Sequence, residues 1–196
     1  MLAETSHSGS SQASSHGAMQ RPQGLQASWT RGQTLINVRG DASDTALCQA
    51  ITALTGLDWP LPPCSTRVQS GHRGIWAGPD DWFLMGPGSV RADWLAQLRD
   101  AFQGRHAAVT DVSSGYAVLS LQGPHVRDLL AQGCPVDLHP EAFKAGDCVG
   151  THFFKASVWM WQTGEDRFEL LVRSSFAGYV QSMLNKCALE DRLVWV

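Results

Sequence analysis

Three acidic side chains are the best candidates for acid–base chemistry in this sequence. Asp80 and Asp81 are adjacent in a Gly-Pro-Asp-Asp turn, and Asp111 stands in a Thr-Asp-Val-Ser-Ser-Gly turn. Paired carboxylates can exchange protons when their surroundings separate their pKa values. Neighbours in a turn more often face water, and a turn aspartate commonly accepts a hydrogen bond from the backbone two residues on. We prefer the turn interpretation for all three and assign no catalytic residue.

The histidines and cysteines do not show the spacing of a metal site. His125, His139 and His152 stand apart, without a spaced ligand partner. The five cysteines are Cys48, Cys64, Cys134, Cys148 and Cys187. An odd number without a CxxC pair favours reduced thiols in a cytosolic protein. Cys134 has no base near it in sequence, so we predict neither a nucleophile nor a metal ligand.

A Gly-Pro-Gly-Ser segment at residues 86–89 precedes a predicted helix and could hold an anion at the helix N-terminus. It lacks the GxGxxG and GxxxxGK[ST] patterns, and proline removes one N–H donor. We therefore predict a turn and helix cap, and assign no cofactor-binding residue.

Composition describes a folded protein with a polar tail. The chain has 196 residues, 43% of them hydrophobic and 17% charged, and its formal net charge is −3. This charge does not favour binding to nucleic acid or to an anionic membrane. No run approaches the ~20 apolar residues that span a bilayer, and the N-terminus lacks the apolar core of a signal peptide. We expect a cytoplasmic protein.

The chain divides into a tail and one domain. Residues 1–28 are rich in Ser, Gly, Gln and His and are predicted to be disordered, and Met19 is an alternative start. The domain spans 29–196. Strands are predicted at 34–38, 67–69, 74–77, 82–85, 116–121, 147–154, 157–162 and 168–172. Helices are predicted from Ser43 or Asp44 to Thr55, over 90–102, after Pro124, and from Ser174 or Ser175 onward. Residues 193–196 either pack down or dock on a partner.

The two halves, 29–105 and 106–196, share one pattern: strand, helix, several short strands and an amphipathic helix. Leu35 corresponds to Leu119 and Trp82 to Phe168 at nearly constant spacing. We therefore predict an α+β fold of two pseudo-repeated units. The two sheets can either share a core or leave a cleft between them, and a cleft is where a ligand would sit. Eight tryptophans beside two tyrosines indicate a large core, with some rings at a subunit interface.

Three segments carry a family resemblance. RGIWAGPDDWFLMG at 73–86 resembles the W-x-G-P-D-[ED]-W-x-L segment of the gamma subunit of heterotetrameric sarcosine oxidase. The stretches VTDVSSGYAVLSLQGPHVRDLLAQGCPVDLHP at 109–140 and FELLVRSSFAGYVQSMLNKC at 168–187 resemble two further segments of that family, and residues 143–146 fit between them. The resemblance covers most of residues 30–188, in order and with compatible spacing.

The resemblance implies a fold related to the glycine-cleavage aminomethyltransferase, and a place in a complex of alpha, beta, gamma and delta subunits. Such complexes oxidise sarcosine to glycine, pass electrons through flavin to oxygen and deliver the one-carbon unit to tetrahydrofolate. The resemblance places FAD and FMN on beta, NAD and tetrahydrofolate on alpha, and zinc on delta. It implies that gamma is non-catalytic, binds no cofactor itself and packs mainly on alpha.

The sequence also departs from related proteins. Ser114 stands where many relatives carry His, and no segment matches the carboxylate motif with which aminomethyltransferases hold folate. Two alternatives stay open. One is a free-standing folate-binding protein or one-carbon transferase, which the two-unit architecture and Asp111 favour. The other is an equivalent subunit of an N-methylglutamate dehydrogenase-type complex.

Overall fold

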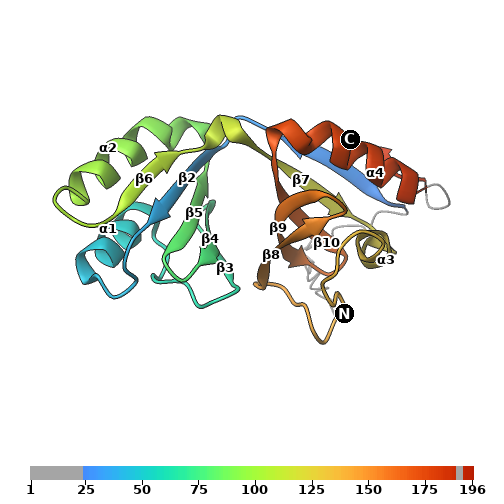
Figure 1. The fold of residues 1–196 in the computed structure, drawn as a ribbon, viewed down its shortest axis with the longest axis horizontal. Helices are drawn as coiled ribbons and strands as arrows, with labels where there is room; N and C mark the ends of the chain where they lie inside the picture. Colours follow the sequence, from blue (N-terminus) through green and yellow to red (C-terminus); the bar gives the residue numbers. More distant parts are fainter. Residues whose placement is uncertain (1–23, 189–191) are drawn as a thin grey trace, which may run out of the picture.

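Two β-sheets face each other, and helices cover their outer sides (Figure 1). The structure, a computed structural model, describes residues 24–188 and 192–196. The first sheet has the strand order β3-β4-β5-β2-β6. Its strands are β2 (Thr34–Arg39), β3 (Thr66–Gln69), β4 (His72–Gly78), β5 (Asp81–Gly86) and β6 (Ala108–Asp111).

The second sheet has the strand order β11-β1-β7-β10-β9-β8. Its strands are β1 (Gln26–Thr30), β7 (Tyr116–Gln122), β8 (Cys148–Phe153), β9 (Ala156–Gly164), β10 (Arg167–Arg173) and β11 (Val194–Trp195). The predicted α+β class is confirmed. No helix in the described part of the chain is long and apolar enough to cross a membrane.

Helices α1 (Thr45–Thr55) and α2 (Arg91–Ala101) cover the outer side of the first sheet. Asp44 caps α1 as predicted, because its side chain accepts from the Ala46 and Leu47 amides, and Gly56 ends the helix in a left-handed conformation. The side chains buried beneath these helices include Leu47, Ile51, Trp82, Trp94 and Leu98. This layer is one of the cores that hold the fold together.

Helices α3 (Val126–Ala131) and α4 (Ala177–Cys187) cover the second sheet over a core that includes Leu119, Phe168, Val180 and Leu184. The predicted serine cap of α4 is wrong. Ser174 and Ser175 lie in a short 3₁₀ turn, η3 (Ser174–Phe176), and the helix has no side-chain cap. The Ser174 hydroxyl instead donates to the Ser114 carbonyl at 3.1 Å.

A third apolar layer lies between the two sheets. The first sheet contributes Leu35, Ile75, Phe83 and Met85, and the second contributes Val118, Cys148, Trp161 and Leu171. The side chains on one face of each strand pack against the helices, and those on the other face pack against the opposite sheet. The molecule therefore has four layers, helix–sheet–sheet–helix.

A polar cluster crosses this inner layer. Arg73 of β4 lies 3.4 Å from the Glu169 carboxylate of β10, and the Trp161 indole N–H donates to the same carboxylate at 2.8 Å. The Arg73 guanidinium also lies 5.1 Å from the centre of the Trp161 ring. Burial lowers the pKa of Arg73, and the nearby Glu169 charge opposes that change. This cluster joins the two sheets through charge as well as apolar contact.

Each half of the sequence contributes its first strand to the sheet formed by the other half. β1 precedes β2 in the chain but pairs with β7, and β6 precedes β7 but pairs with β2. The predicted halves, 29–105 and 106–196, thus exchange one strand each, because β6 pairs in the first sheet and β1 in the second. The predicted tail boundary at residue 28 is wrong. β1 begins at Gln26, and Leu25 and Ala27 are fully buried. The disorder predicted for residues 1–23 lies outside the described residues.

The registers correct one predicted correspondence between the halves. Leu35 pairs with Met85 and Val118 pairs with Leu171, and all four side chains lie in the inner layer. Leu119 points to the opposite, helix-covered side. Val118, rather than Leu119, therefore occupies the position that matches Leu35.

The C-terminal strand β11 packs down, which is one of the two predicted outcomes. It runs parallel to β1, and Trp195 stacks on Trp29 with ring centroids 6.4 Å apart. Every tryptophan is buried or partly buried, as a large core requires. The exposed large apolar residues are Val68, Phe176, Val194 and Val196.

Candidate functional site

A pocket of about 470 Å³ opens where the inner faces of the two sheets separate. We call it the inter-sheet pocket. Its lining comes from both sheets and from the β6–β7 connection, and comprises Asn37, Asp81, Phe83, Asp111, Val112, Ser114, Gly115, Tyr116, Trp159 and Arg173. It brings together two of the acids singled out from the sequence.

Three aromatic rings form one wall of the pocket. Phe83 lies edge-on to Trp159 with ring centroids 4.9 Å apart and to Tyr116 at 5.8 Å, and Tyr116 and Trp159 are 6.3 Å apart. The rings come from β5, β7 and β9, so both sheets fix their positions. Edge-to-face contacts of this kind stabilise an aromatic cluster beyond its buried area. The wall is rigid and largely apolar.

The Asp81 carboxylate is held by neighbours on β2. Asn37 Nδ2 donates to Oδ1 at 2.5 Å, and Arg39 Nε lies 3.5 Å from Oδ2. The same Asn37 nitrogen also donates to the Trp82 carbonyl at 3.1 Å. Asp81 therefore ties the ends of β2 and β5 together at the rim of the pocket.

The Asp111 carboxylate is held in the turn that the sequence predicted. It accepts from the Ser113 amide at 3.0 Å and from the Ser113 hydroxyl at 2.6 Å. Arg91 Nε donates to its other oxygen at 2.7 Å, and Arg91 Nη2 contacts that oxygen as well. Burial acts to raise the pKa of Asp111, but the Ser113 bonds and the Arg91 guanidinium outweigh it and lower the pKa. Asp111 is held as a carboxylate at neutral pH and is unsuited to donate a proton.

Arg173 closes the pocket at the end of β10. Its guanidinium lies 5.5 Å from the centre of the Tyr116 ring, a distance typical of a cation–π contact. Burial raises the pKa of the Tyr116 phenol, the Arg173 charge opposes this rise, and the Asp81 charge adds to it. The phenol therefore stays protonated and can donate a hydrogen bond.

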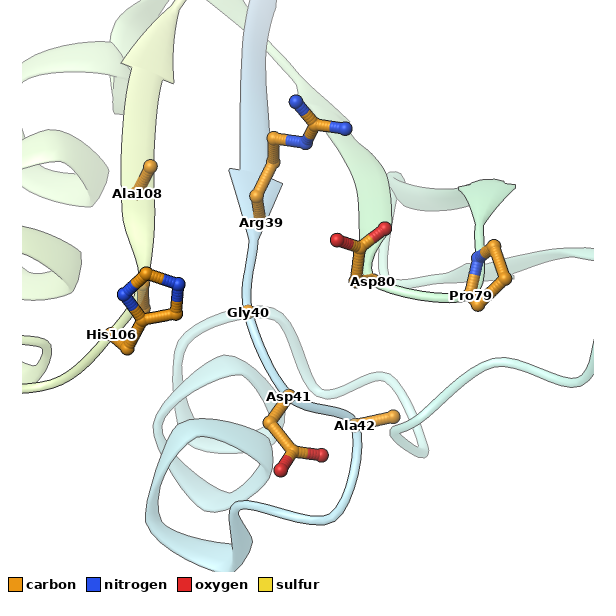
Figure 2. A pocket seen from close by; sticks show the side chains of 9 residues that line it. Arg39, Gly40, Asp41, Ala42, Pro79, Asp80, His106 and Ala108 are labelled. Atoms are coloured by element: carbon orange, nitrogen blue, oxygen red, sulfur yellow. The ribbon is translucent and has the colours of Figure 1, made fainter.

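Asp80 does not act with Asp81. Asp80 lines a separate open pocket of about 770 Å³, together with Arg39, Asp41 and His106 (Figure 2). Hydrogen bonds from the Ser43 amide and hydroxyl lower the pKa of Asp41, although burial and the Asp44 charge oppose them. The adjacent aspartates thus lie in two different pockets, and the paired-carboxylate hypothesis has no support in the geometry.

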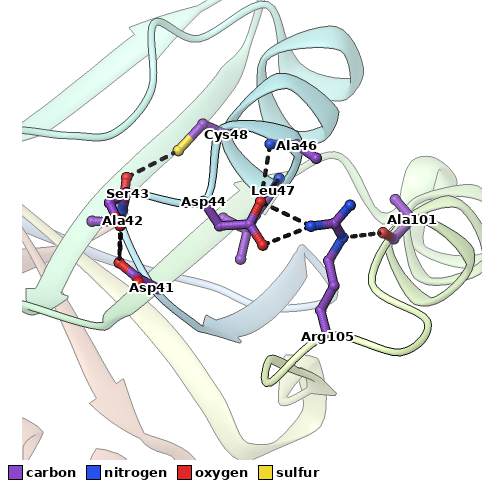
Figure 3. A network of polar contacts seen from close by, with 9 residues as sticks. All are labelled: Asp41, Ala42, Ser43, Asp44, Ala46, Leu47, Cys48, Ala101 and Arg105. Atoms are coloured by element: carbon purple, nitrogen blue, oxygen red, sulfur yellow. Dashed lines mark hydrogen bonds and ion pairs between the residues drawn. The ribbon is translucent and has the colours of Figure 1, made fainter.

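The polar contacts beside that larger pocket hold the structure together (Figure 3). Arg105 Nη1 binds both Asp44 oxygens, at 3.0 and 2.8 Å, while Asp44 also caps α1. Arg105 Nε donates to the Ala101 carbonyl at 3.3 Å. These bonds fasten the start of α1 to the segment that follows α2.

The histidines and cysteines considered from the sequence as ligands or nucleophiles lie far apart in the fold. His125 is exposed and contacts Asp128 at 3.2 Å, and His139 and His152 are exposed as well. Cys134 is buried, with its sulfur 3.7 Å from the Thr151 hydroxyl. Within the described residues, no three His, Cys, Asp or Glu side chains lie together as a set of metal ligands.

The 86–89 segment forms the predicted turn. The Thr34 hydroxyl donates to the Pro87 carbonyl at 2.7 Å, and the one-turn 3₁₀ helix η1 (Gly88–Val90) leads into α2. A Cβ on Gly88 would lie only 2.5 Å from the Gly32 carbonyl oxygen, so this position requires glycine. Gly88 allows the backbone of this turn to lie close to the backbone at Gly32.

Sequence reasoning did not assign Asn37, Phe83, Tyr116, Trp159 or Arg173 to a site. All five lie in strands, on the face directed toward the other sheet. The signal that could have found them is alternation within each predicted strand, counted from Leu35, Met85 and Val118. Using this alternation to find a site requires knowing beforehand that the two sheets face each other.

A family model described as "Sarcosine oxidase, gamma subunit family" matches residues 39–190. A curated relative, the sarcosine oxidase subunit gamma of Corynebacterium sp. (strain P-1), is 33% identical over 146 residues. That alignment covers 73% of this chain and 70% of the relative. The chain belongs to the sarcosine oxidase gamma subunit family.

Solved structures agree with this family assignment. A chain of the heterotetrameric sarcosine oxidase from Corynebacterium sp. U-96, in complex with pyrrole 2-carboxylate, superposes with a TM-score of 0.78 at 28% identity. The match covers 85% of this chain and 84% of that chain. Aminomethyltransferase T of the glycine cleavage system from Bartonella henselae superposes with a TM-score of 0.66 at 15% identity, over 89% of this chain and 48% of that chain. The second likeness concerns the fold alone, and it confirms the predicted kinship in fold.

The structure shows where Ser114 lies, the position at which many relatives carry His. Ser114 lies in the short turn η2 (Ser113–Gly115), at the rim of the inter-sheet pocket. Its side chain is exposed, and its carbonyl receives the Ser174 hydroxyl. In this gamma subunit family member, the turn joins the two sheets at the point where the pocket opens.

Proposed function

We propose that this chain is the gamma subunit of a heterotetrameric sarcosine oxidase and contributes no catalytic residue of its own. The observation that carries the proposal is the superposition on a chain of such a heterotetramer over 85% of the present sequence. The complex would demethylate sarcosine oxidatively to glycine and pass the one-carbon unit to tetrahydrofolate, in the cytoplasm.

The state of the acids supports a non-catalytic role. In the inter-sheet pocket, Asp81 is paired with Arg39 and Asp111 with Arg91. Burial acts to raise the pKa of Asp111, but the Ser113 hydrogen bonds and the Arg91 guanidinium lower it, so Asp111 is a weak general acid near pH 7. Asp111, the acid with the most constrained geometry, is the clearest case.

The cofactors belong, on this proposal, to the other subunits: FAD, FMN, NAD and tetrahydrofolate. The described residues do not fit these groups well. Residues 86–89 form a tight turn closed against Gly32 and do not form a phosphate-binding loop. The two carboxylates that could hold a pterin ring are already engaged by arginines. We therefore derive no step of the reaction through a group bound to this chain.

The partners would be the alpha, beta and delta subunits, with the main contact on alpha. Exposed apolar side chains that a partner could cover include Val68 at the β3 edge and Phe176 at the start of α4. The two-unit architecture would be an internal duplication. It is supported by the strand order, since β3-β4-β5-β2-β6 matches β8-β9-β10-β7-β1 position by position.

Purification of the complex from its natural source tests the proposal. The expected result is co-elution of this chain with three other subunits, and an isolated chain without flavin absorbance. A purified, active sarcosine oxidase complex from the same cells that lacks this chain would contradict it. Comparing the complex on sarcosine and on N-methylglutamate then separates a sarcosine oxidase from a dehydrogenase of the related type.

The free-standing alternative has its own test. Tetrahydrofolate is titrated into the isolated chain while tryptophan fluorescence is followed, because Trp159 lies in the inter-sheet pocket. The scaffold proposal predicts no saturable quenching at millimolar ligand. Saturable quenching together with one-carbon transfer by the chain alone would favour the alternative.

A further inference from the structure

The acids of the inter-sheet pocket are already neutralised by arginines outside its lining. Arg39 lies 3.5 Å from Asp81, and the Arg91 guanidinium contacts Asp111 through Nε at 2.7 Å and through Nη2. A cationic ligand would have to displace one of these arginines to reach a carboxylate. The pocket is therefore poorly suited to an amine.

Arg173 is the charge that remains. In the described part of the chain its guanidinium forms no salt bridge and no hydrogen bond, and its one recorded contact is the face of the Tyr116 ring, at 5.5 Å. The Tyr116 hydroxyl likewise has no hydrogen-bond partner in that part of the chain, and its phenol pKa is raised by burial. A free guanidinium and a protonated phenol thus lie side by side, and both donate hydrogen bonds.

We propose that the inter-sheet pocket binds a small carboxylate with a flat, apolar body. The carboxylate lies on Arg173 and accepts from the Tyr116 hydroxyl, while the body packs against Trp159 and Phe83. A planar guanidinium suits a carboxylate because two parallel N–H bonds match its two oxygens. A volume of about 470 Å³ lies within the ordinary range for small-ligand pockets. This inference stands apart from the proposed function, since it concerns a site within this chain.

The full-length chain is titrated with benzoate, and with benzamide as the uncharged ligand of the same shape, while tryptophan fluorescence, to which Trp159 in the pocket contributes, is followed. The expected result is saturable quenching by benzoate at about tenfold or more lower concentration than by benzamide, since a charge-assisted hydrogen bond is stronger than a neutral one. Arg173→Gln should remove this preference, and Arg173→Lys should keep part of it. The matched control Arg99→Gln, an exposed arginine on α2, should leave it unchanged.

Equal binding of benzoate and benzamide, binding of benzoate to Arg173→Gln as to the natural chain, or no saturable binding would each overturn the proposal. Thermal unfolding of each variant checks that it is folded.

The intact complex then shows where the carboxylate comes from. If the complex also binds benzoate through Arg173, the ligand is a free small molecule. If the complex does not bind benzoate, and Arg173→Gln weakens the affinity of this chain for the remaining subunits about tenfold, the carboxylate belongs to a partner. A complex that neither binds benzoate nor depends on Arg173 for assembly would overturn a role for the pocket in the assembled protein.

Discussion

The Arg91 guanidinium contacts one oxygen of Asp111 through two nitrogens, and so fastens the first turn of α2 to the end of β6. The other Asp111 oxygen accepts from the Ser113 amide and hydroxyl. The carboxylate singled out for chemistry is thus fixed from both sides at the place where the chain passes from one sheet to the other. Its geometry leads to the first prediction.

Asp111→Asn should destabilise the protein at pH 7 by up to about 1 kcal/mol, the range of a partly exposed ion pair. The pKa of Asp111 in the folded protein lies below the ordinary aspartate value of 3.8. Its contribution is therefore fully present above pH 3.8 and is lost as the pH falls through the lower, folded pKa. Urea unfolding measures how much the free energy of unfolding of the variant differs from that of the natural chain. The difference should be equal at pH 7 and pH 5 and smaller at pH 3. The control is Asp128→Asn, whose side chain is 79% exposed. A difference that grows toward pH 3 would contradict the assignment.

Removing one member of the partly buried cluster between the sheets should be costly. Arg73→Met should lower the free energy of unfolding by about 1–3 kcal/mol, because the Glu169 carboxylate loses its counter-charge in the inner layer. Adding Glu169→Gln should restore part of the loss, since it removes the charge and keeps an acceptor for the Trp161 indole. Urea unfolding of the single and double variants measures this. If the single variant Arg73→Met and the double variant were equally stable, the unpaired Glu169 charge would not be the cause of the loss.

The cap of α1 should contribute measurably to stability. Asp44→Ala removes the acceptor of the Ala46 and Leu47 amides and the partner of Arg105, and should lower the unfolding temperature more than the two variants below. Arg105→Gln leaves the cap in place and should cost less. Asp41→Ala is the matched control, because the Asp41 side chain accepts from the Ser43 amide and hydroxyl in the loop before the helix and does not bond to the helix amides. Thermal unfolding of the three variants gives the ranking, and a larger effect for Asp41→Ala would contradict it.

The thiols should differ sharply in reactivity. Burial, together with the nearby Cys64 thiol, raises the pKa of Cys148 to about 12, although Arg73 opposes this shift. The reactive form of a cysteine is the thiolate, so Cys148 should resist alkylation at pH 8 while the exposed Cys64 reacts. Mass spectrometry after brief iodoacetamide treatment, with and without urea, measures both sites. Cys148 should react only in urea, and equal labelling in the native protein would refute the burial argument.

The sequence predicted well the elements that carry a local signal. Asp44 and Gly56 mark the ends of α1 because a cap and a left-handed stop are properties of single residues. Strands β4, β5, β9 and β10 were found with small differences at their ends, since their apolar runs are bounded by turn residues. The family resemblance covered most of residues 30–188, and the family model matches residues 39–190.

Other features depend on contacts far apart in the chain. β1 was missed because Leu25 and Ala27 stand among polar residues, and they are buried only when β7 lies beside them. β6 was not predicted, and its last two residues were placed in the turn that follows, because four residues with alternating exposure carry little signal before they pair with β2. The residues that line the inter-sheet pocket were not predicted for the same reason. Arg173 and Asn37 are 136 positions apart in the printed sequence, and only the facing of the sheets brings them to one pocket.

The exchange of β1 and β6 between the sheets has a consequence for the order of synthesis. As the chain leaves the ribosome, β1 emerges almost a hundred residues before its neighbour β7. The five strands of the first sheet can assemble once residue 111 is out, whereas β1 must wait for the second half of the chain. Two fragments cut near the midpoint should therefore each lack a strand and refold only when mixed.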